Sequence, residues 1–264
     1  MKIMIGIIGG SGLYNIEGVI VKEKTDISTP YGAPSDSYTI ADLKGINLAF
    51  LPRHGANHSI PPHKINYRAN IWGFKKLGVE RIIATGATGS IDALMSPGTI
   101  VVPDQIIDMT NGREATFFNG EEGVVHIDFT EPYCPELRNS IIEAGNILGI
   151  NLRKSGTYLC TNGPRLETRA EIEFYSQIRA DIVGMTGMPE ACLAREAEIC
   201  YASLAIVTNY AAGITGKKLT TTEVIENMNK SNAILKNLLK KTILLLPPIR
   251  KCSCKEALTN SKVN

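Results

Sequence analysis

Residues 3–12, Ile-Met-Ile-Gly-Ile-Ile-Gly-Gly-Ser-Gly, decide the fold, because a short apolar run ends directly in a glycine-rich turn. β-Branched residues bounded by glycine predict a buried strand. The small residues that follow let backbone amides and the Ser11 hydroxyl approach an oxyanion closely. The spacing differs from the Gly-x-Gly-x-x-Gly of dinucleotide-binding proteins, and no Walker lysine follows. The alternative is an ordinary tight turn between a strand and a loop.

Similar apolar runs recur along the chain, and amphipathic segments separate them. We predict strands at 3–8, 48–51, 82–84, 99–102, 157–160, 182–183 and 204–207. Apolar residues at three- and four-residue spacing predict helices at 65–77, 135–148, 170–178, 189–198 and 222–244. This alternation predicts a single-domain α/β sandwich, with a central mixed β-sheet flanked by helices and site residues on loops at strand ends.

Composition limits the class of protein. With 264 residues, of which 44% are hydrophobic, the chain can bury one substantial core. We assign residues 1–246 to this domain, and we expect the tail at 247–264, which contains Lys and Cys, to be mobile beyond Pro247 and Pro248. A net charge of +2 gives no strong field for nucleic acid or membrane, so neither is an expected partner. We expect a cytoplasmic protein, because the start lacks a signal-peptide pattern and no apolar run approaches the roughly 20 residues of a membrane span.

Six cysteines in a chain of this length do not indicate a disulfide scaffold. A structural zinc site needs four ligands. The tail pair Cys252 and Cys254 supplies two, without a nearby histidine. A zinc site is therefore not expected, and nothing else in the sequence implies a metal or an organic cofactor.

Four blocks, in their order along the chain, resemble the trimeric purine nucleoside phosphorylase and methylthioadenosine phosphorylase family. They are residues 7–13 (Ile-Ile-Gly-Gly-Ser-Gly-Leu), 51–55 (Leu-Pro-Arg-His-Gly), 62–71 (Pro-His-Lys-Ile-Asn-Tyr-Arg-Ala-Asn-Ile) and 184–190 (Gly-Met-Thr-Gly-Met-Pro-Glu). The resemblance extends from residue 3 to about 245. Each block alone is weak, whereas the ordered set is specific. It implies a homotrimer, or a dimer of trimers, with each active site completed by its neighbour.

The resemblance implies a phosphate site. Arg53 follows a strand and Pro52, so its guanidinium could hold phosphate in a bidentate manner, and His54 could donate a further hydrogen bond. Without the resemblance, an Arg-His pair of this kind is usually just surface. The positions that match the family's phosphate ligands are Ser11, Arg53, His54, Gly86, Ala87 through its amide, and Thr186. Some relatives carry Thr where Gly86 stands.

The resemblance also places the nucleoside. Met185 corresponds to a residue that lies against the ribose, although by itself it would be a core side chain. His126 resembles a histidine that reaches the 5′ end of the sugar from a neighbouring subunit, and the alternative is a structural histidine. Thr221 aligns with a position where enzymes for a free 5′-hydroxyl tend to carry histidine, and its smaller side chain leaves room for a methylthio group.

The base is predicted from Glu167, which follows Leu166, and from the segment Asn209-Tyr210-Ala211. Methylthioadenosine enzymes of the family typically have Asp-Tyr-Asp in this segment and often a small hydroxyl residue in place of the Glu. A carboxylate accepts the N1 hydrogen of hypoxanthine or guanine, and a carboxamide can donate to N7 and meet O6. The pair therefore favours a 6-oxopurine over adenine.

These residues imply an enzyme that cleaves the N-glycosidic bond reversibly with inorganic phosphate as co-substrate, and Arg53, His54 and Asn209 are the expected catalytic residues. S-Methyl-5′-thioinosine is the expected nucleoside, with inosine and guanosine as further substrates. The alternatives are an S-methyl-5′-thioadenosine phosphorylase, a nucleosidase that uses water, and a non-catalytic nucleoside-binding protein.

The cysteines remain open in this comparison. The segment from Cys252 to Cys254 resembles a tail motif of some hyperthermophilic archaeal members of the family, in which intracellular disulfides occur. Whether Cys134 pairs with Cys200, and whether the two tail cysteines are oxidised, does not follow from the sequence.

Overall fold

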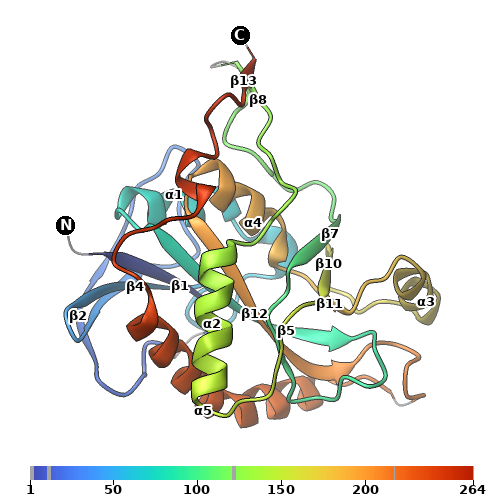
Figure 1. The fold of residues 1–264 in the computed structure, drawn as a ribbon. Coiled ribbons are helices and arrows are strands. Elements are labelled where there is room, and N and C mark those ends of the chain that lie inside the picture. Colours follow the sequence, from blue (N-terminus) through green and yellow to red (C-terminus); the bar gives the residue numbers. More distant parts are fainter. Residues whose placement is uncertain (1–2, 11–12, 121–122, 217, 264) are drawn as a thin grey trace.

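In the computed structural model, which describes residues 3–10, 13–120, 123–216 and 218–263, strands and helices alternate along the chain (Figure 1). The strands are β1 (Met4–Gly9), β2 (Val19–Thr25), β3 (Tyr38–Leu43), β4 (Ile46–Pro52), β5 (Arg81–Ser90), β6 (Ile100–Val101), β7 (Gln105–Met109), β8 (Val124–Val125), β9 (Leu152–Arg153), β10 (Thr157–Thr161), β11 (Ile182–Gly184), β12 (Cys200–Tyr210) and β13 (Lys262–Val263). The helices are α1 (Tyr67–Lys76), α2 (Pro135–Ile147), α3 (Arg169–Gln177), α4 (Gly187–Glu196) and α5 (Thr221–Leu245), with short 3₁₀ segments η1 (Pro62–Lys64) and η2 (Ser253–Glu256).

Eleven strands form one mixed sheet. Its main path runs β2-β3-β4-β1-β5-β11-β10-β7, and β12 pairs with β5 and with the short strand β6. β1, β4, β5 and β12 are parallel to their neighbours in this set, whereas β11 lies antiparallel to the far end of β5. The carboxyl ends of the parallel strands therefore meet along one edge, and the predicted fold class is confirmed.

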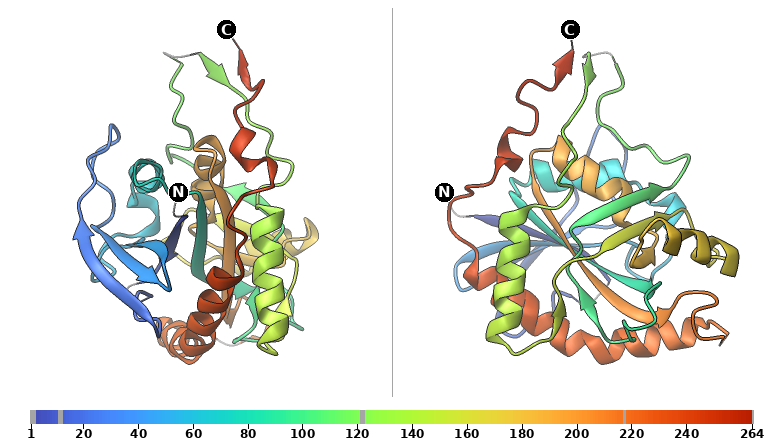
Figure 2. Two further views of the ribbon diagram at one scale, coloured as in Figure 1. Left: turned by 60° about the vertical axis from the view of Figure 1, so that its left-hand side comes forward. Right: turned by 45° about the vertical axis from the view of Figure 1, so that its right-hand side comes forward.

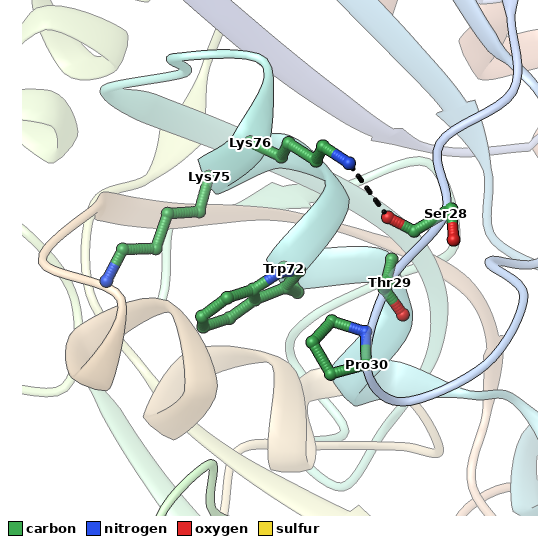
Figure 3. Close-up of a pocket in the computed structure, with 6 residues that line it drawn as sticks. All are labelled: Ser28, Thr29, Pro30, Trp72, Lys75 and Lys76. Carbon is green, nitrogen blue, oxygen red and sulfur yellow. Dashed lines mark hydrogen bonds between the residues drawn. The ribbon is translucent and has the colours of Figure 1, made fainter.

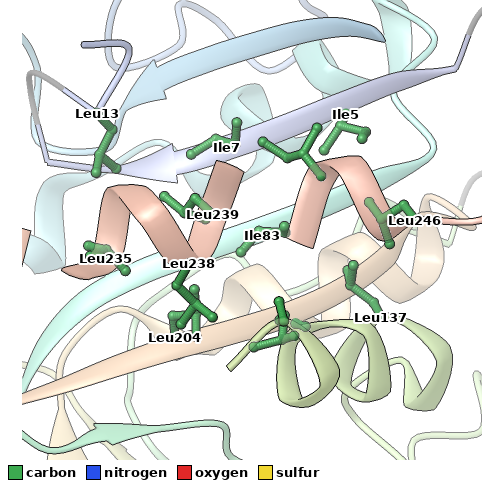
Figure 4. Close-up of a cluster of buried hydrophobic side chains, with 14 of the residues drawn as sticks. Ile5, Ile7, Leu13, Ile83, Leu137, Leu204, Leu235, Leu238, Leu239 and Leu246 are labelled. Atoms are coloured by element: carbon green, nitrogen blue, oxygen red, sulfur yellow. The ribbon is translucent and has the colours of Figure 1, made fainter. Parts of the chain in front are cut away.

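Helices cover both faces of the sheet (Figure 2). On one face, α2 and α5 pack over β1, β5 and β12, and Figure 4 shows Leu235, Leu238 and Leu239 of α5 against Ile7 and Ile83. Each of these five side chains is at most 1% exposed, and burying one contributes roughly 1.5–3 kcal/mol. On the other face, α1 and α4 cover a second apolar cluster. The sheet thus lies between two apolar cores, and loops line the edge where the carboxyl ends of its parallel strands meet.

Local sequence explains where the helices begin. The Asn66 side chain accepts a hydrogen bond from the amide of Ala69 at the start of α1, at 3.1 Å. Thr168 and Glu171 form a capping box at α3. The five helices lie where the apolar spacing predicts them.

Two central strands are longer than the sequence suggests. β5 and β12 continue through Thr, Ser, Gly and Asn residues, because each strand has partners that satisfy its backbone. The Thr88 hydroxyl, for example, donates to the Ile206 carbonyl at 3.2 Å. The edge strand β2 was not predicted, since its Val-Ile-Val-Lys-Glu-Lys-Thr sequence is mostly exposed and lacks a buried face.

The C-terminal tail differs from the prediction of a mobile segment. Arg250 Nη1 donates to the Glu198 carbonyl at 2.8 Å, and Cys254 is 2% exposed. β13 pairs antiparallel with β8, and the two strands lie together at the tip seen at the top of Figure 1. The lysines of the tail are typical of a solvent-exposed segment, which explains the prediction. A few buried contacts nevertheless hold the tail against the domain. In the described part of the chain, no helix has both the length and the apolar character to cross a bilayer.

Candidate active site

Arg53 stands at the carboxyl edge of the sheet, where its position is fixed by backbone and side-chain contacts. It directly follows β4, and its amide donates to the Gly9 carbonyl at the end of β1, at 2.9 Å. Its side chain is 3% exposed and donates from Nη1 to the Thr85 carbonyl at 2.7 Å. Arg53 is therefore held at the ends of β4 and β1 and beside the middle of β5.

A buried carboxylate holds the same guanidinium. Glu190 of α4 is 0% exposed and accepts from Arg53 Nε at 2.5 Å and Nη2 at 2.9 Å. The Tyr201 hydroxyl donates to the same carboxylate at 2.9 Å. Burial disfavours the charged form of Arg53, but the charge and hydrogen bonds of Glu190 outweigh this effect and raise the pKa of Arg53 above its ordinary value.

The sequence alone assigns no role to Glu190, although it ends the block at residues 184–190. The usable signal was an acidic residue in the otherwise apolar run Met188-Pro-Glu-Ala-Cys-Leu193. A carboxylate at such a position needs a buried cation. Only the fold shows that the cation is Arg53.

A small polar cavity adjoins Arg53. Its lining residues are Arg53, Thr85, Gly86, Tyr158, Thr186, Gly187, Tyr201 and Ser203. The contacts described above use three of the five guanidinium N–H groups. In the described part of the chain, they leave one N–H on each terminal nitrogen for a further ligand. The Thr85 hydroxyl is also buried and has no hydrogen-bond partner among the described residues.

Thr186 also lines this cavity. It precedes α4 (Gly187–Glu196), in which Met188 has extended backbone angles, so the continuous helix begins only at Pro189; in the described structure the Thr186 side chain makes no capping hydrogen bond. A Cβ atom built on Gly86 would lie 3.6 Å from its hydroxyl oxygen, so the two predicted phosphate ligands adjoin each other. Arg53, Gly86 and Thr186 thus line one small cavity, with Ala87 next along β5.

His54 has a defined tautomer. Its Nδ1 lies 2.8 Å from the Ile60 carbonyl oxygen, which can only accept, so Nδ1 carries the proton. Burial and the charge of Arg53 lower the pKa of His54 from 6.5 to about 4. The imidazole is therefore neutral near pH 7, and Nε2 is a hydrogen-bond acceptor. In this structure, the nitrogen of His54 that remains available is therefore an acceptor, whereas the sequence predicts a donor to phosphate; the role of His54 toward phosphate stays a prediction.

Glu167 is held by the end of β10. The Thr161 hydroxyl donates to Glu167 Oε1 at 2.8 Å and lies 3.4 Å from the Gly184 carbonyl oxygen. Met185 follows Gly184 and contacts Gly163 through its sulfur. The carboxylate predicted to bind the base and the methionine predicted to lie against ribose are thus linked through β10 and β11.

Asn209 lies near the end of β12, opposite Gly89 of β5. Its Nδ2 donates to the Tyr210 carbonyl at 2.9 Å, and its Oδ1 accepts from the Thr208 hydroxyl at 3.0 Å. These partners fix which end of the amide is which. The side chain therefore keeps one N–H group for a ligand. Val183 of β11 also faces Gly89, so the strand ends that carry Asn209 and Glu167 flank the same part of β5.

The other predicted site residues lie elsewhere or outside the description. Ser11 lies outside the described residues. His126 is exposed beside the tail, where its amide donates to the Ser261 carbonyl at 2.8 Å. Thr221 is exposed at the start of α5, and Leu166 is 45% exposed. Ala211 packs in a small apolar cluster, next to the half-buried Tyr210.

A broader surface hollow beside α1 contains none of the predicted site residues. Its lining residues are Ser28, Thr29, Pro30, Trp72, Lys75 and Lys76 (Figure 3). Lys76 Nζ donates to the Ser28 carbonyl at 3.2 Å, and Lys75 lies over the indole ring. The convergent polar groups that chemistry needs are at the smaller cavity of Arg53.

A mixed α/β sandwich with a buried arginine beside a small polar cavity has the features expected of a nucleoside phosphorylase. Residues 4–244 match the family model described as the phosphorylase superfamily. The chain belongs to this superfamily, and the sequence-based identification of a phosphorylase enzyme is confirmed.

Particular relatives agree with this assignment. A protein of Thermodesulfovibrio yellowstonii named a probable S-methyl-5′-thioinosine phosphorylase is 56% identical over 260 residues, which cover 98% of this chain and 97% of the relative. A 6-oxopurine nucleoside phosphorylase of Pyrococcus furiosus is 53% identical and covers 96% of this chain and 97% of its own. The structure of Schistosoma mansoni methylthioadenosine phosphorylase in complex with adenine has a TM-score of 0.93 at 33% identity, with 99% of each chain covered.

Proposed function

We propose that this enzyme cleaves 6-oxopurine nucleosides with inorganic phosphate, that S-methyl-5′-thioinosine is its main substrate, and that inosine and guanosine are further substrates. The observation that carries the proposal is the hydrogen-bonding state of Asn209 and Glu167. Asn209 keeps a donor, and the carboxylate of Glu167 keeps an oxygen beyond the one bound by Thr161. A 6-oxopurine offers the matching acceptors at N7 and O6 and a donor at N1.

Adenine matches this pair less well. Its N1 is an acceptor, so it would face the Glu167 carboxylate without a proton between them. Its 6-amino group needs an acceptor, whereas the Asn209 amide offers its N–H. A ligand that leaves polar groups of the site without hydrogen-bond partners binds much more weakly than one that pairs them.

The reaction follows from the same groups. A phosphate oxygen forms a bond to C1′ as the bond from C1′ to N9 breaks, and the electron pair of that bond leaves with the purine. Arg53 and Thr186 hold the phosphate beside the anomeric carbon. The N–H of Asn209 stabilises the negative charge that gathers at N7. The products are the free purine and a ribose 1-phosphate, or its 5-methylthio derivative, and inorganic phosphate is the only co-substrate proposed.

His54 selects the protonation state of phosphate. Since its Nδ1 proton is bound by Ile60, its Nε2 accepts a hydrogen bond from the P–OH group of HPO₄²⁻. A cationic imidazole would attract phosphate more strongly, but the charge of Arg53 and burial disfavour that form. In this proposal, Arg53 supplies the charge and His54 supplies the acceptor.

We also propose that the site is completed in a trimer, because His126 and Thr221 lie on elements other than those around Arg53. The second candidate function is S-methyl-5′-thioadenosine phosphorylase, which is favoured by the name of the Schistosoma neighbour. Its typical Asp-Tyr-Asp is replaced here by Asn209-Tyr210-Ala211.

A substrate panel tests the proposal. Methylthioinosine, inosine, guanosine, methylthioadenosine and adenosine would each be assayed with and without phosphate. We expect phosphate-dependent turnover and a higher kcat/KM for each 6-oxopurine than for its 6-amino partner. Equal or greater kcat/KM for methylthioadenosine would reject the base assignment, turnover without phosphate would indicate a nucleosidase, and tight binding without turnover would indicate a binding protein.

A further inference from the structure

Four of the six cysteines meet at one point that lies outside the proposed active site. Cys134 caps the start of α2, Cys200 begins β12, and Cys252 and Cys254 belong to the tail around η2. Their sulfur atoms all lie within 4.8 Å of one another, and the Sγ atoms of Cys200 and Cys252 are 3.3 Å apart. The fold thus gathers four thiols from three separate elements.

We propose that Cys134, Cys200, Cys252 and Cys254 form a tetrathiolate site for a zinc ion, and that this ion fastens the C-terminal tail to the body of the protein. The sequence argued against zinc because the tail supplies only two ligands. The structure removes that objection, since Cys134 and Cys200 supply the other two. Tetrahedral zinc with Zn–S bonds of about 2.3 Å needs sulfurs roughly 3.8 Å apart, which matches the cluster.

The surroundings of the cluster suit thiolate ligands. Cys134, Cys200 and Cys254 are each at most 2% exposed, so solvent has little access to their sulfurs. Cys134 stands at the N-terminus of the 13-residue helix α2 and makes no capping hydrogen bond through its side chain. A helix N-terminus stabilises a thiolate. Burial of four thiolates without a cation would be costly, and a divalent metal removes most of that charge.

A buried arginine provides a second, independent observation. Arg81 is 0% exposed and lies directly opposite Cys200 in the pairing of β5 with β12, so both side chains leave the same face of the sheet. Among the described residues, its Nε and Nη1 have no hydrogen-bond partner. A tetrathiolate zinc site keeps a net charge of −2, and cationic N–H donors around such sites offset it. Arg81 places a cation opposite one of the four ligands, and the same guanidinium also pairs with Glu80 at 3.7 Å and with Glu136 at 3.5 Å.

The site has a structural consequence near His126. The tail continues from Cys254 to β13, which pairs with β8, and Ser261 accepts from the amide of His126. Fixing Cys252 and Cys254 therefore fixes the strand that holds the segment of His126. The metal has a positioning role, because it lies among groups that touch neither phosphate nor purine.

Metal content of the full-length protein tests the site directly. The protein is purified under reducing, anaerobic conditions, and zinc is measured by mass spectrometry. We expect about one zinc per chain. Cobalt added to the metal-depleted protein should give thiolate-to-cobalt charge transfer and tetrahedral d–d bands, and zinc should abolish both. Cys252→Ser, at a partly exposed position, should lower bound zinc about tenfold or more, whereas Cys192→Ser, outside the cluster, should keep it.

Two results would overturn the proposal. The reduced wild-type protein could bind neither zinc nor cobalt, or the protein as isolated could hold the four sulfurs as two disulfides and still bind no metal after reduction. Alkylation of the unfolded protein with and without prior reduction counts the disulfides. Neither result bears on the proposed phosphorylase activity, because the substrate panel tests that activity independently of metal binding.

The role in the tail has its own measurement. Trypsin can cut after Lys251 and Lys255 once the tail detaches. With free zinc at ten times its dissociation constant, the open population should fall about tenfold, and so should the cleavage rate. An unchanged cleavage rate in the zinc-loaded protein would reject the fastening role.

Discussion

Glu190→Gln tests whether the buried ion pair prepares Arg53 for phosphate. The substitution keeps the shape of the side chain and removes its charge. Arg53 then remains 3% exposed with a positive charge that no carboxylate neutralises. Since Gln offers a single oxygen, one of the two guanidinium hydrogen bonds also becomes an unfavourable contact between two N–H donors.

Removing one partner of a buried ion pair typically costs about 3–5 kcal/mol. We expect about 2–4 kcal/mol here, because Gln can still accept one hydrogen bond from Arg53 or from Tyr201. Phosphate should enlarge the loss, because the variant binds the anion more weakly and therefore gains less stability from it than wild type does. If the misplaced guanidinium loses about 2 kcal/mol of phosphate binding, the phosphate KM rises about 30-fold.

Urea unfolding with and without phosphate measures the first quantity, and initial rates at varied phosphate measure the second. Glu196→Gln is the matched control. Glu196 is a buried carboxylate of the same helix and binds Thr116 and the Phe117 amide instead of a cation. The Glu196→Gln variant should lose stability, but its KM for phosphate should not rise. An unchanged phosphate KM in Glu190→Gln would refute the idea that Glu190 positions Arg53.

Three further predictions concern the base and the pH dependence. Asn209→Asp should lower the ratio of kcat/KM for methylthioinosine to that for methylthioadenosine about tenfold or more, because an acceptor replaces the amide donor; an unchanged ratio would contradict the base assignment. Thr161→Val removes the hydroxyl that holds Glu167, so kcat/KM on inosine should fall roughly 5- to 30-fold while the phosphate KM stays within about twofold; a rise confined to the phosphate KM would count against this role. The pKa of His54 is lowered from 6.5 to about 4, so the unfolded chain binds an extra proton between these values and stability should fall as pH drops through this window. The loss is at most about 3 kcal/mol and smaller after solvent screening, and urea unfolding of wild type and His54→Asn at pH 4 and 7 should show less pH dependence in the variant.

The sequence predicted the five helices and the strands β1, β4, β5, β6, β10, β11 and β12 because their signals are local, whereas β3 and β7 were not predicted. Periodicity placed α1 to α5, and Gly or Pro bounded the apolar runs of β1, β4 and β10. β2 was not predicted, because this edge strand lacks the alternation of apolar and polar residues that a buried face imposes. The full length of β5 and β12 could not be predicted, because both strands contain polar residues. The hydrogen-bonding groups of these residues are satisfied only by neighbouring strands.

The site shows a similar limit. Arg53 and Thr186 could be assigned from motifs, and the structure brings both to one cavity. The ion-pair partner of Arg53 could not be predicted, because Glu190 is 137 residues away in the sequence. The tautomer of His54 likewise depends on the Ile60 carbonyl, and sequence patterns do not record which backbone oxygen lies next to an imidazole.

The strand β12 connects the two sites proposed for this chain and also keeps them apart. It begins at Cys200, in the thiol cluster, and reaches Asn209, beside the proposed base site, nine residues later. At about 3.3 Å per residue, these ends lie roughly 30 Å apart along a buried strand. At an effective dielectric constant of about 20, two unit charges that far apart interact by only about 0.5 kcal/mol. We therefore expect the main influence of the tail on catalysis to pass through β13, β8 and the segment of His126, where it would alter recognition of the 5′ group and leave the proposed choice between 6-oxo and 6-amino purines to Asn209 and Glu167.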